Sequence, residues 1–585
     1  MSELIRLEMR DWLYNAGLLG VYRILKHNNE YVKVGINYIE FYKNSLDKFG
    51  AKLLNYLVDK YKNFLPYHEM MKREYVVNNF KEDTFEDSVK AINDTIELLK
   101  KILNPQGTSY YKYYKDEIYL LLKDETLLKL AKSLKKISDK DKSKFEVVKA
   151  QVDILKEIFD YMKQDNVKTL IQYKDVAQKI IKNQWNKVAF LNGSSGGKKR
   201  DMIEEYNDYF VEAFIEQLRY LEEDKRKVEG VCICCNEDIE KIMPRKSGDA
   251  IRRSFSFSFV NNMGVDANKK VGHFYDSNES LICPICNLVY SCIVCGFNQL
   301  NKSGLFINQN SSFDKLIKAN NISINMSDTL DELENKSYYA ILNTIEQDKV
   351  KALSKELDNI QVIKFEVVNS KTKYSFNILN RKLMKVILNN KDSLEKLLKY
   401  TSVALDDGSY IDIYKEVISR LYNNQNLFDL IKKLIRYYSV EKFKFLKNSA
   451  IYVIKLVIII NNDFINNINN NKGVFKMEEI KDVWKAIGVG ERLHDEYVKN
   501  KMENKIGNVV YRLNNIIDTN NKDEFVKSII KVYSYFLNSG NTKLISDLKH
   551  FAFLNSNVDT QVFKSFANSF LIGLISGSNK NKKDE

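Results

Sequence analysis

The chain has 585 residues and a mass of 68.4 kDa, which is too long for one hydrophobic core, and 44% of its residues are apolar. It holds only four prolines and 22 glycines, which argues against a turn-rich all-β fold and predicts a predominantly helical α+β protein. The formal charge of +14 favours a polyanionic partner. A biased, Lys- and Asn-rich composition, as in residues 461–472, is the alternative source of that charge.

The sequence pattern predicts neither a secretory signal nor a membrane-spanning helix. The opening MSELIRLEMRDW lacks the apolar core of a secretory signal. The most apolar run, residues 451–460, contains Lys455 and is shorter than the ~20 residues that span a bilayer. We therefore expect a cytoplasmic protein with no membrane partner, whose cysteines stay reduced.

Helices are predicted over most of residues 1–183. The opening segment is expected to be a helix with Leu4, Leu7, Met9 and Trp12 in its apolar set. In the following WLYNAGLLGVYRIL, Gly17 and Gly20 interrupt the helical pattern and predict a bend that brings backbone close to another element. Helical periodicity returns over residues 85–103 and 127–162, with Pro105 and Gly107 between them.

A short strand, WNKVAF, is predicted after Gln184, and it leads into a polar, glycine-rich loop. The glycines and the lack of apolar residues predict an exposed loop whose amides and cations suit phosphates or groove edges. A plain solvated linker is the alternative. The spacing of Gly193 and Gly197 does not fit a nucleotide-binding P-loop. The candidate nucleic-acid-binding residues here are Asn192, Gly193, Ser194, Ser195, Gly196, Gly197, Lys198, Lys199 and Arg200.

All seven cysteines fall between Cys232 and Cys295, in CICC (232–235), CPIC (283–286) and a third C-x-x-C. Two C-x-x-C pairs supply four thiolates with the spacing of a closed structural zinc site. We choose Cys232, Cys235, Cys283 and Cys286 as ligands, because Pro284 gives the second pair a rigid turn. Cys292 and Cys295 lie in an apolar stretch where buried free thiols are ordinary. Cys234 and His273 remain possible substitutes, and an iron–sulfur cluster remains possible.

The insert between the two pairs is predicted to be basic. RRSFSFSFV (252–260) alternates Phe with Ser, as a strand with one buried face does. The cations around it predict a second nucleic-acid-binding surface. These are Arg245, Lys246, Arg252 and Arg253, with Lys241 nearby.

Residues 362–368 and 373–379 are predicted to form a hairpin, and the chain is expected to return to helices from about residue 380. Stripes from Ile506 to Ile517 and from Phe525 to Leu537 repeat at three- and four-residue steps, as bundle cores do. The predicted divisions are a helical or mixed scaffold, a basic loop with the zinc-binding insert, a mixed α/β region, a helical region and a C-terminal helical bundle. Their limits are 1–183, 184–300, 301–380, 381–476 and 477–585.

Catalytic motifs are scarce. Only five histidines occur, and the pair His494 and Asp495 has no second histidine near it in sequence. The stretch around it is predicted to be the solvent side of a helix. No dinucleotide fingerprint, kinase motif or nucleophile elbow is present. We therefore expect a binding protein and not an enzyme.

Taken together, CICC and CPIC around a long basic insert, NLVYSCIVCGF after CPIC, WLYNAGLLG and WNKVAFLNG resemble the large subunit of type I-B CRISPR Cascade. The resemblance is to the branch named for its CXXC–CXXC signature and covers most of residues 1 to about 400. It is carried by the combination of motifs. The extra Cys234, Cys292 and Cys295 depart from a four-cysteine pattern and leave the ligand choice open.

The resemblance implies a non-catalytic subunit of an RNA-guided surveillance complex that acts in antiviral defence. It would recognise the protospacer-adjacent motif in double-stranded DNA, aid R-loop formation and recruit a helicase–nuclease. Its partners would be CRISPR RNA, target DNA and the backbone, 5′-handle-binding and small subunits. Residues from Met477 onward would then resemble a small subunit, made separately if Met477 is an internal start. A zinc-stabilised nucleic-acid-processing enzyme is the alternative, and a protein-binding scaffold is a third class.

Overall fold

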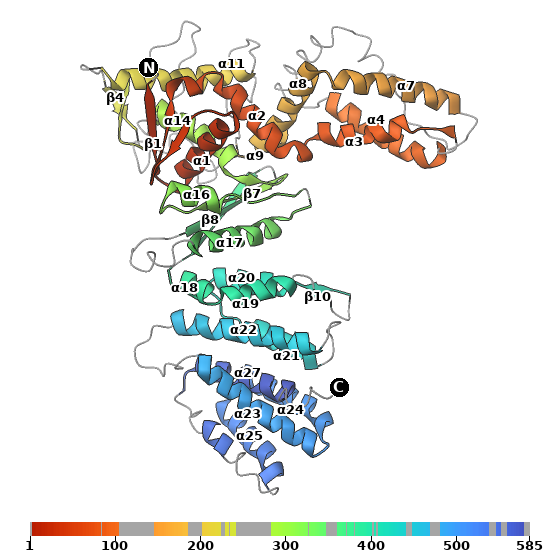
Figure 1. The fold of residues 1–585 in the computed structure, drawn as a ribbon, viewed down its shortest axis with the longest axis vertical. Helices are drawn as coiled ribbons and strands as arrows, with labels where there is room; N and C mark the ends of the chain where they lie inside the picture. Colours follow the sequence, from red (N-terminus) through yellow and green to blue (C-terminus); the bar gives the residue numbers. More distant parts are fainter. Residues whose placement is uncertain are drawn as a thin grey trace. The chain divides into compact units, whose positions relative to one another are not determined.

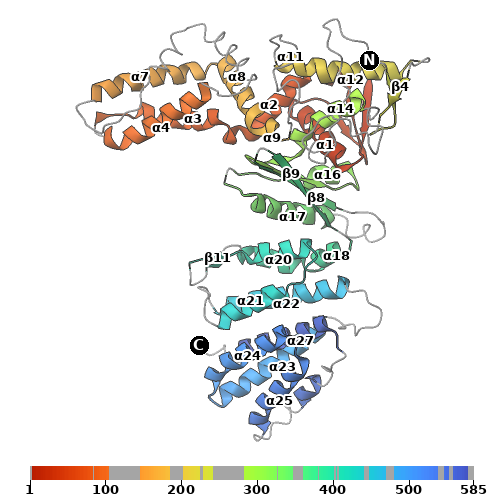
Figure 2. The same ribbon diagram turned by 180° about the vertical axis from the view of Figure 1, so that it is seen from behind.

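A computed structural model of the chain describes residues 3–82, 85–103, 145–184, 202–223, 228–232, 234–240, 282–325, 327–346, 360–369, 371–379, 381–400, 403–404, 408–439, 447–468, 480–537, 546–551 and 558–577. The chain divides into two compact units, Met1–Thr344 with Ile360–Phe376, and Ile345–Asn359 with Asn377–Glu585. The fold is predominantly helical with small antiparallel sheets, as composition predicts (Figures 1 and 2).

The first unit begins with a strand. β1 (Leu4–Glu8) pairs with β3 (Tyr38–Tyr42), which also pairs with β2 (Val32–Val34), all antiparallel. Along β1 alternate residues are buried, with Ile5 and Leu7 facing the core. The helix predicted for this segment is therefore wrong. Its apolar residues fit a three-residue step, but the backbone of β3 offers hydrogen-bond partners that fix the two-residue period.

α1 (Trp12–His27) is the central helix of this unit, and its side chains from Leu13 to Leu25 are largely buried. It is continuous through Gly17 and Gly20, so the predicted bend is wrong, but the close approach of backbone is confirmed. A Cβ on Gly17 would lie 2.1 Å from the Val289 carbonyl oxygen, and one on Gly20 would lie 2.0 Å from that of Cys292. Glycine is required because α1 touches the backbone of the segment after the second cysteine pair.

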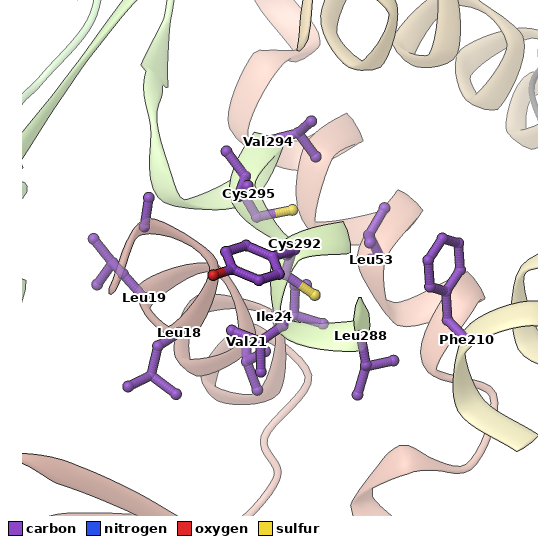
Figure 3. Close-up of a cluster of buried hydrophobic side chains, with 14 of the residues drawn as sticks. Leu18, Leu19, Val21, Ile24, Leu53, Phe210, Leu288, Cys292, Val294 and Cys295 are labelled. Atoms are coloured by element: carbon purple, nitrogen blue, oxygen red, sulfur yellow. The ribbon is translucent and has the colours of Figure 1, made fainter. Parts of the chain in front are cut away.

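Helices α14 (Pro284–Ser291) and α15 (Ile293–Gly296) form that segment and pack against α1. Apolar side chains from α1, α2 (Phe49–Tyr61) and the helical segment η6 (Asn207–Glu212) surround the thiols of Cys292 and Cys295 (Figure 3). Both thiols are 0% exposed. The prediction that these two cysteines are buried core residues is confirmed.

The rest of the first unit completes this core and adds a second one. α3, α4, α7 and α8 lie side by side around a separate apolar cluster (Figure 1). The predicted helix over 85–103 is confirmed as α4, and α7 lies within the helix predicted over 127–162. The bounds are η1 (Lys43–Leu46), η2 (Lys62–Phe64), α3 (Pro66–Asn78), α4 (Phe85–Leu103), α7 (Phe145–Met162), α8 (Asp165–Val176), η5 (Ala177–Ile181), α9 (Lys182–Gln184), α11 (Met202–Tyr206), η6 (Asn207–Glu212) and α12 (Ala213–Leu221).

A four-stranded antiparallel sheet has the order β6-β7-β8-β9. Its strands are β6 (Asn298–Gln299), β7 (Ser303–Asn308), β8 (Ile360–Val368) and β9 (Lys371–Leu379). The predicted hairpin is confirmed as β8 and β9. Two helices accompany these strands in sequence, α16 (Phe313–Ala319) and α17 (Leu330–Glu346).

The described residues of the second unit are mostly helical and include the short strand pair β10 (Val403–Ala404) and β11 (Tyr410–Ile411). The predicted C-terminal stripes are confirmed as α24 and α25, although Ile530 is 51% exposed. α23 and α27 pack closely, because Gly490 and Gly573 leave no Cβ between their backbones. The bounds are α18 (Arg381–Asn389), α19 (Lys391–Leu397), η8 (Leu398–Tyr400), α20 (Ile413–Tyr422), α21 (Phe428–Ser439), α22 (Lys447–Ile468), α23 (Ile480–Lys499), η9 (Glu503–Lys505), α24 (Ile506–Asp518), α25 (Lys522–Leu537), η10 (Lys549–Phe551) and α27 (Thr560–Ser576).

Among the described helices, none combines the length and the apolar character needed to cross a bilayer.

Candidate metal centre

The first cysteine pair lies in the turn of a small hairpin formed by β4 (Val228–Val231) and β5 (Asp238–Glu240). The Cys232 amide donates to the Glu237 carbonyl at 2.9 Å, and Asn236 closes the turn with a φ of 61°. The Cys234 amide points at the Cys232 sulfur at 3.4 Å. This turn therefore directs a backbone N–H group toward a cysteine sulfur, which stabilises a thiolate.

The second pair lies at the N-terminus of α14. Cys283 caps this helix, and the Cys286 amide donates to its sulfur at 3.4 Å. Pro284 occupies the first turn of the helix, where a missing N–H costs nothing. The Cys283 amide in turn donates to the Cys232 sulfur at 3.2 Å, which joins the two pairs. The positive end of the helix also favours thiolates here.

The four predicted ligand sulfurs of Cys232, Cys235, Cys283 and Cys286 all lie within 4.8 Å of one another. The sulfurs of Cys235 and Cys283 lie 3.6 Å apart. A tetrahedral ion with metal–sulfur bonds of about 2.3 Å requires sulfurs about 3.8 Å apart. The cluster can hold one metal ion. In an iron–sulfur cluster the thiolates divide among two or more irons, whereas a single ion gathers all four.

The pKa values of the cysteines in this cluster are shifted in different directions. Hydrogen bonds with the other cysteines, led by Cys234 and Cys235, hold the pKa of Cys232 far below its usual range. Interaction with Cys232 is then the largest cause that raises the pKa values of Cys283 and Cys286 above their usual range. Thiolates therefore form most readily at Cys232 and Cys235, since the pKa of Cys235 is also lowered, to about 7, whereas the full four-thiolate state requires a cation to displace the remaining protons.

Residues at the start of α1 and just before it lie beside the four sulfurs. The Arg10 guanidinium donates to the Cys286 sulfur at 3.3 Å and lies 4.8 Å from the centre of the Tyr14 ring. Tyr14 is 0% exposed, and its hydroxyl has no hydrogen-bond partner among the residues that the structure describes. Burial, and next the charge of Cys286, raise the pKa of Tyr14 well above its usual value. A buried donor without an acceptor suits a site that gains negative charge when its thiols deprotonate.

Cys234 is not part of the four-sulfur group, although it adjoins the site. Its sulfur lies 3.2 Å from the Tyr290 hydroxyl, which also lies 3.1 Å from the Asp11 carboxylate. The other carboxylate oxygen of Asp11 caps α1 at the Leu13 and Tyr14 amides. This chain of contacts links the first cysteine turn to α14 and to α1. Spacing along the sequence gave no signal for Arg10, Asp11 or Tyr290.

The remaining sequence-predicted candidates have different outcomes. The His494 ring Nδ1 lies 2.8 Å from the Leu574 carbonyl, and the ring packs against Gly577. His494 is therefore half-buried between helices, and its predicted place on the solvent side of a helix is wrong. The glycine-rich loop at 192–200, the basic residues Arg245, Lys246, Arg252 and Arg253, and His273 and Met477 lie outside the described residues.

We expect metal affinity to fall as the pH is lowered. Cys283 and Cys286, whose pKa values are raised, must lose protons to bind, so each added proton competes with the metal. Competition with a colorimetric chelator at mildly alkaline, neutral and mildly acidic pH measures this dependence. Zinc added to the metal-free protein should release protons to a weakly buffered indicator. Affinity that does not change with pH, without proton release, would contradict ligation by these thiols.

No family model matches the chain, and neither a curated protein nor a solved structure matches it significantly.

Proposed function

We propose that the four cysteines bind one structural zinc ion, which fastens the β4–β5 hairpin to the N-terminus of α14. The observation that carries this proposal is the convergence of four sulfurs, from pairs far apart in sequence, into a space that suits one tetrahedral ion. Every ligand position is filled by protein, so the ion has no open site for a substrate. The role of the zinc is therefore structural, and folding free energy is what it supplies.

We further propose that the chain is the non-catalytic large subunit of a type I-B CRISPR Cascade. The support is the resemblance carried by CICC, CPIC with NLVYSCIVCGF, WLYNAGLLG and WNKVAFLNG, together with the charge of +14. Two of these motifs pack together, because α1 contains WLYNAGLLG and touches the backbone of α14 and α15. In such a complex the guide RNA reads the sequence, and the protein needs a short groove-reading loop and a positive path for DNA.

Expression with the candidate backbone and 5′-handle-binding subunits and a guide RNA tests this function. We expect the chain to copurify with the guide RNA and to give the assembly preference for duplexes that carry the protospacer-adjacent motif. A purified chain that hydrolyses nucleic acid unaided would favour the nucleic-acid-processing enzyme instead. A chain that assembles with proteins and never with guide RNA would favour a scaffold.

The basic loop gives a sharper test. Lys198→Ala, Lys199→Ala and Arg200→Ala together should weaken binding of the target duplex by the assembled complex. Each lost phosphate contact should also reduce the slope of log affinity against log salt by about 0.9. A matched variant removes three exposed lysines from α4 and α7, Lys90, Lys100 and Lys149. Equal effects of the two triple variants across a salt series would show that total charge, and not this loop, matters.

A further inference from the structure

We propose that Arg10 is the charge-compensating residue of the metal centre. Its guanidinium stabilises the anion that forms when four thiolates bind one divalent ion, and thereby sets how tightly that ion is held. This inference rests on the proposed metal site and is independent of the proposed role in a surveillance complex.

Contacts of both its backbone and its side chain hold Arg10 in place. It lies between β1 and α1, where its amide donates to the Asn15 side-chain oxygen at 2.7 Å and its carbonyl accepts from the Asn15 side-chain nitrogen at 3.0 Å. Its guanidinium lies over the Tyr14 ring and donates to the Cys286 sulfur. Anchored backbone and stacked side chain together hold the cation at the sulfur, which lowers the entropic cost of the contact.

The charges of the site explain why a cation is needed there. A divalent ion with four thiolates carries a formal charge of −2, in surroundings where the ligands are mostly buried. Cys232 and Cys283 accept hydrogen bonds from uncharged backbone amides. Among the described residues, the cation that donates to a ligand sulfur is Arg10. Arg10 therefore offsets part of the negative charge at Cys286.

Two measurable consequences follow. Removing the positive charge should weaken zinc binding, and loss of an outer contact to a metal ligand typically costs about 10–100-fold in affinity. The second concerns iron substituted for zinc. A single iron in four thiolates changes from a formal charge of −1 to −2 when an electrode supplies one electron, so a nearby cation stabilises the reduced form. Without Arg10 the reduction potential should shift to a more negative value.

The test compares Arg10→Gln with Arg10→Lys in the full chain. Arg10→Gln should bind zinc about 10–100-fold more weakly in chelator competition and should lower the potential of the iron-loaded protein. Arg10→Lys keeps the charge and should recover most of both properties. Arg6→Gln is the matched control, because it removes a cation from β1 that pairs with Glu40 at 2.5 Å. It should leave affinity and potential unchanged.

The cobalt-loaded proteins provide the check on structure, since their thiolate-to-metal absorption reports four-sulfur coordination. Arg10→Gln with an unchanged cobalt spectrum, unchanged zinc affinity and unchanged iron potential would overturn the role of Arg10 while leaving the metal site intact. If the metal-free variant is too unstable for chelator competition, the reduction potential of its iron-loaded form still tests the role of Arg10. A parent protein that takes up no zinc, cobalt or iron would instead overturn the site itself.

Discussion

Cys232→Ser is expected to remove the metal and to destabilise the first unit severely. The Cys232 sulfur accepts hydrogen bonds from both cysteine segments, and its neighbours make it the most acidic thiol of the group. Structural zinc contributes about 10–16 kcal/mol of folding free energy in small peptides that depend on it. The apolar core of this unit lowers that dependence, so the expected result is a metal-free protein with a low soluble yield and an early thermal transition.

Cys234→Ser and Cys292→Ser separate the metal from other roles of cysteine. Cys234 lies outside the four-sulfur group, so its replacement should leave one ion per chain. Cys292 is fully buried and burial raises its pKa to about 12, so serine there should reduce stability without loss of metal. Metal analysis and thermal unfolding of the three variants measure this pattern. If Cys232→Ser kept its metal while Cys234→Ser lost it, the ligand assignment would be wrong.

Gly296→Ala is expected to destabilise the first unit without any change in metal content. A Cβ at this position would lie 1.8 Å from the Ala16 carbonyl oxygen, so the backbones of α1 and α15 would have to separate. Overpacking in a core typically costs about 1–3 kcal/mol, and a clash between backbones lies at or above the upper end. Urea unfolding measures the resulting loss in the free energy of unfolding of the first unit.

Gly507→Ala is the control for replacing a helical glycine by alanine where no clash results. A Cβ on Gly507 of α24 meets nothing within 4 Å, so alanine there should be neutral or stabilising by up to about 1 kcal/mol. A Gly296→Ala protein as stable as its parent would show that α1 and α15 do not pack as closely as described.

The cysteine site could be predicted because its information is local. Each C-x-x-C pair forms a turn that brings two sulfurs together, and Pro284 makes the second turn rigid. Cys292 and Cys295 could be assigned to the core because apolar residues surround them in sequence. The residues around the ligands could not be predicted: Arg10 and Cys286 are separated by 276 positions, and nothing in the sequence near Arg10 signals a thiolate partner.

Helices were predicted well where apolar residues recur on one face over many residues. Short elements were predicted poorly where pairing with another strand determines the secondary structure. The stripes of α24 and α25 are long enough to define helices alone. β1 is five residues long, and both periods fit its apolar residues until β3 supplies backbone partners. Gly17 and Gly20 predicted close contact correctly, but α1 remains straight enough to be one helix because its packing against α14 and α15 supports it.

The central claim is that Cys232, Cys235, Cys283 and Cys286 share one metal ion. X-ray absorption spectroscopy of the full-length protein, purified without added metal and accompanied by elemental analysis, tests it most directly. The account predicts one zinc per chain, bound by four sulfurs at about 2.3 Å. Several irons with inorganic sulfide, or zinc bound mainly by nitrogen and oxygen, would contradict it.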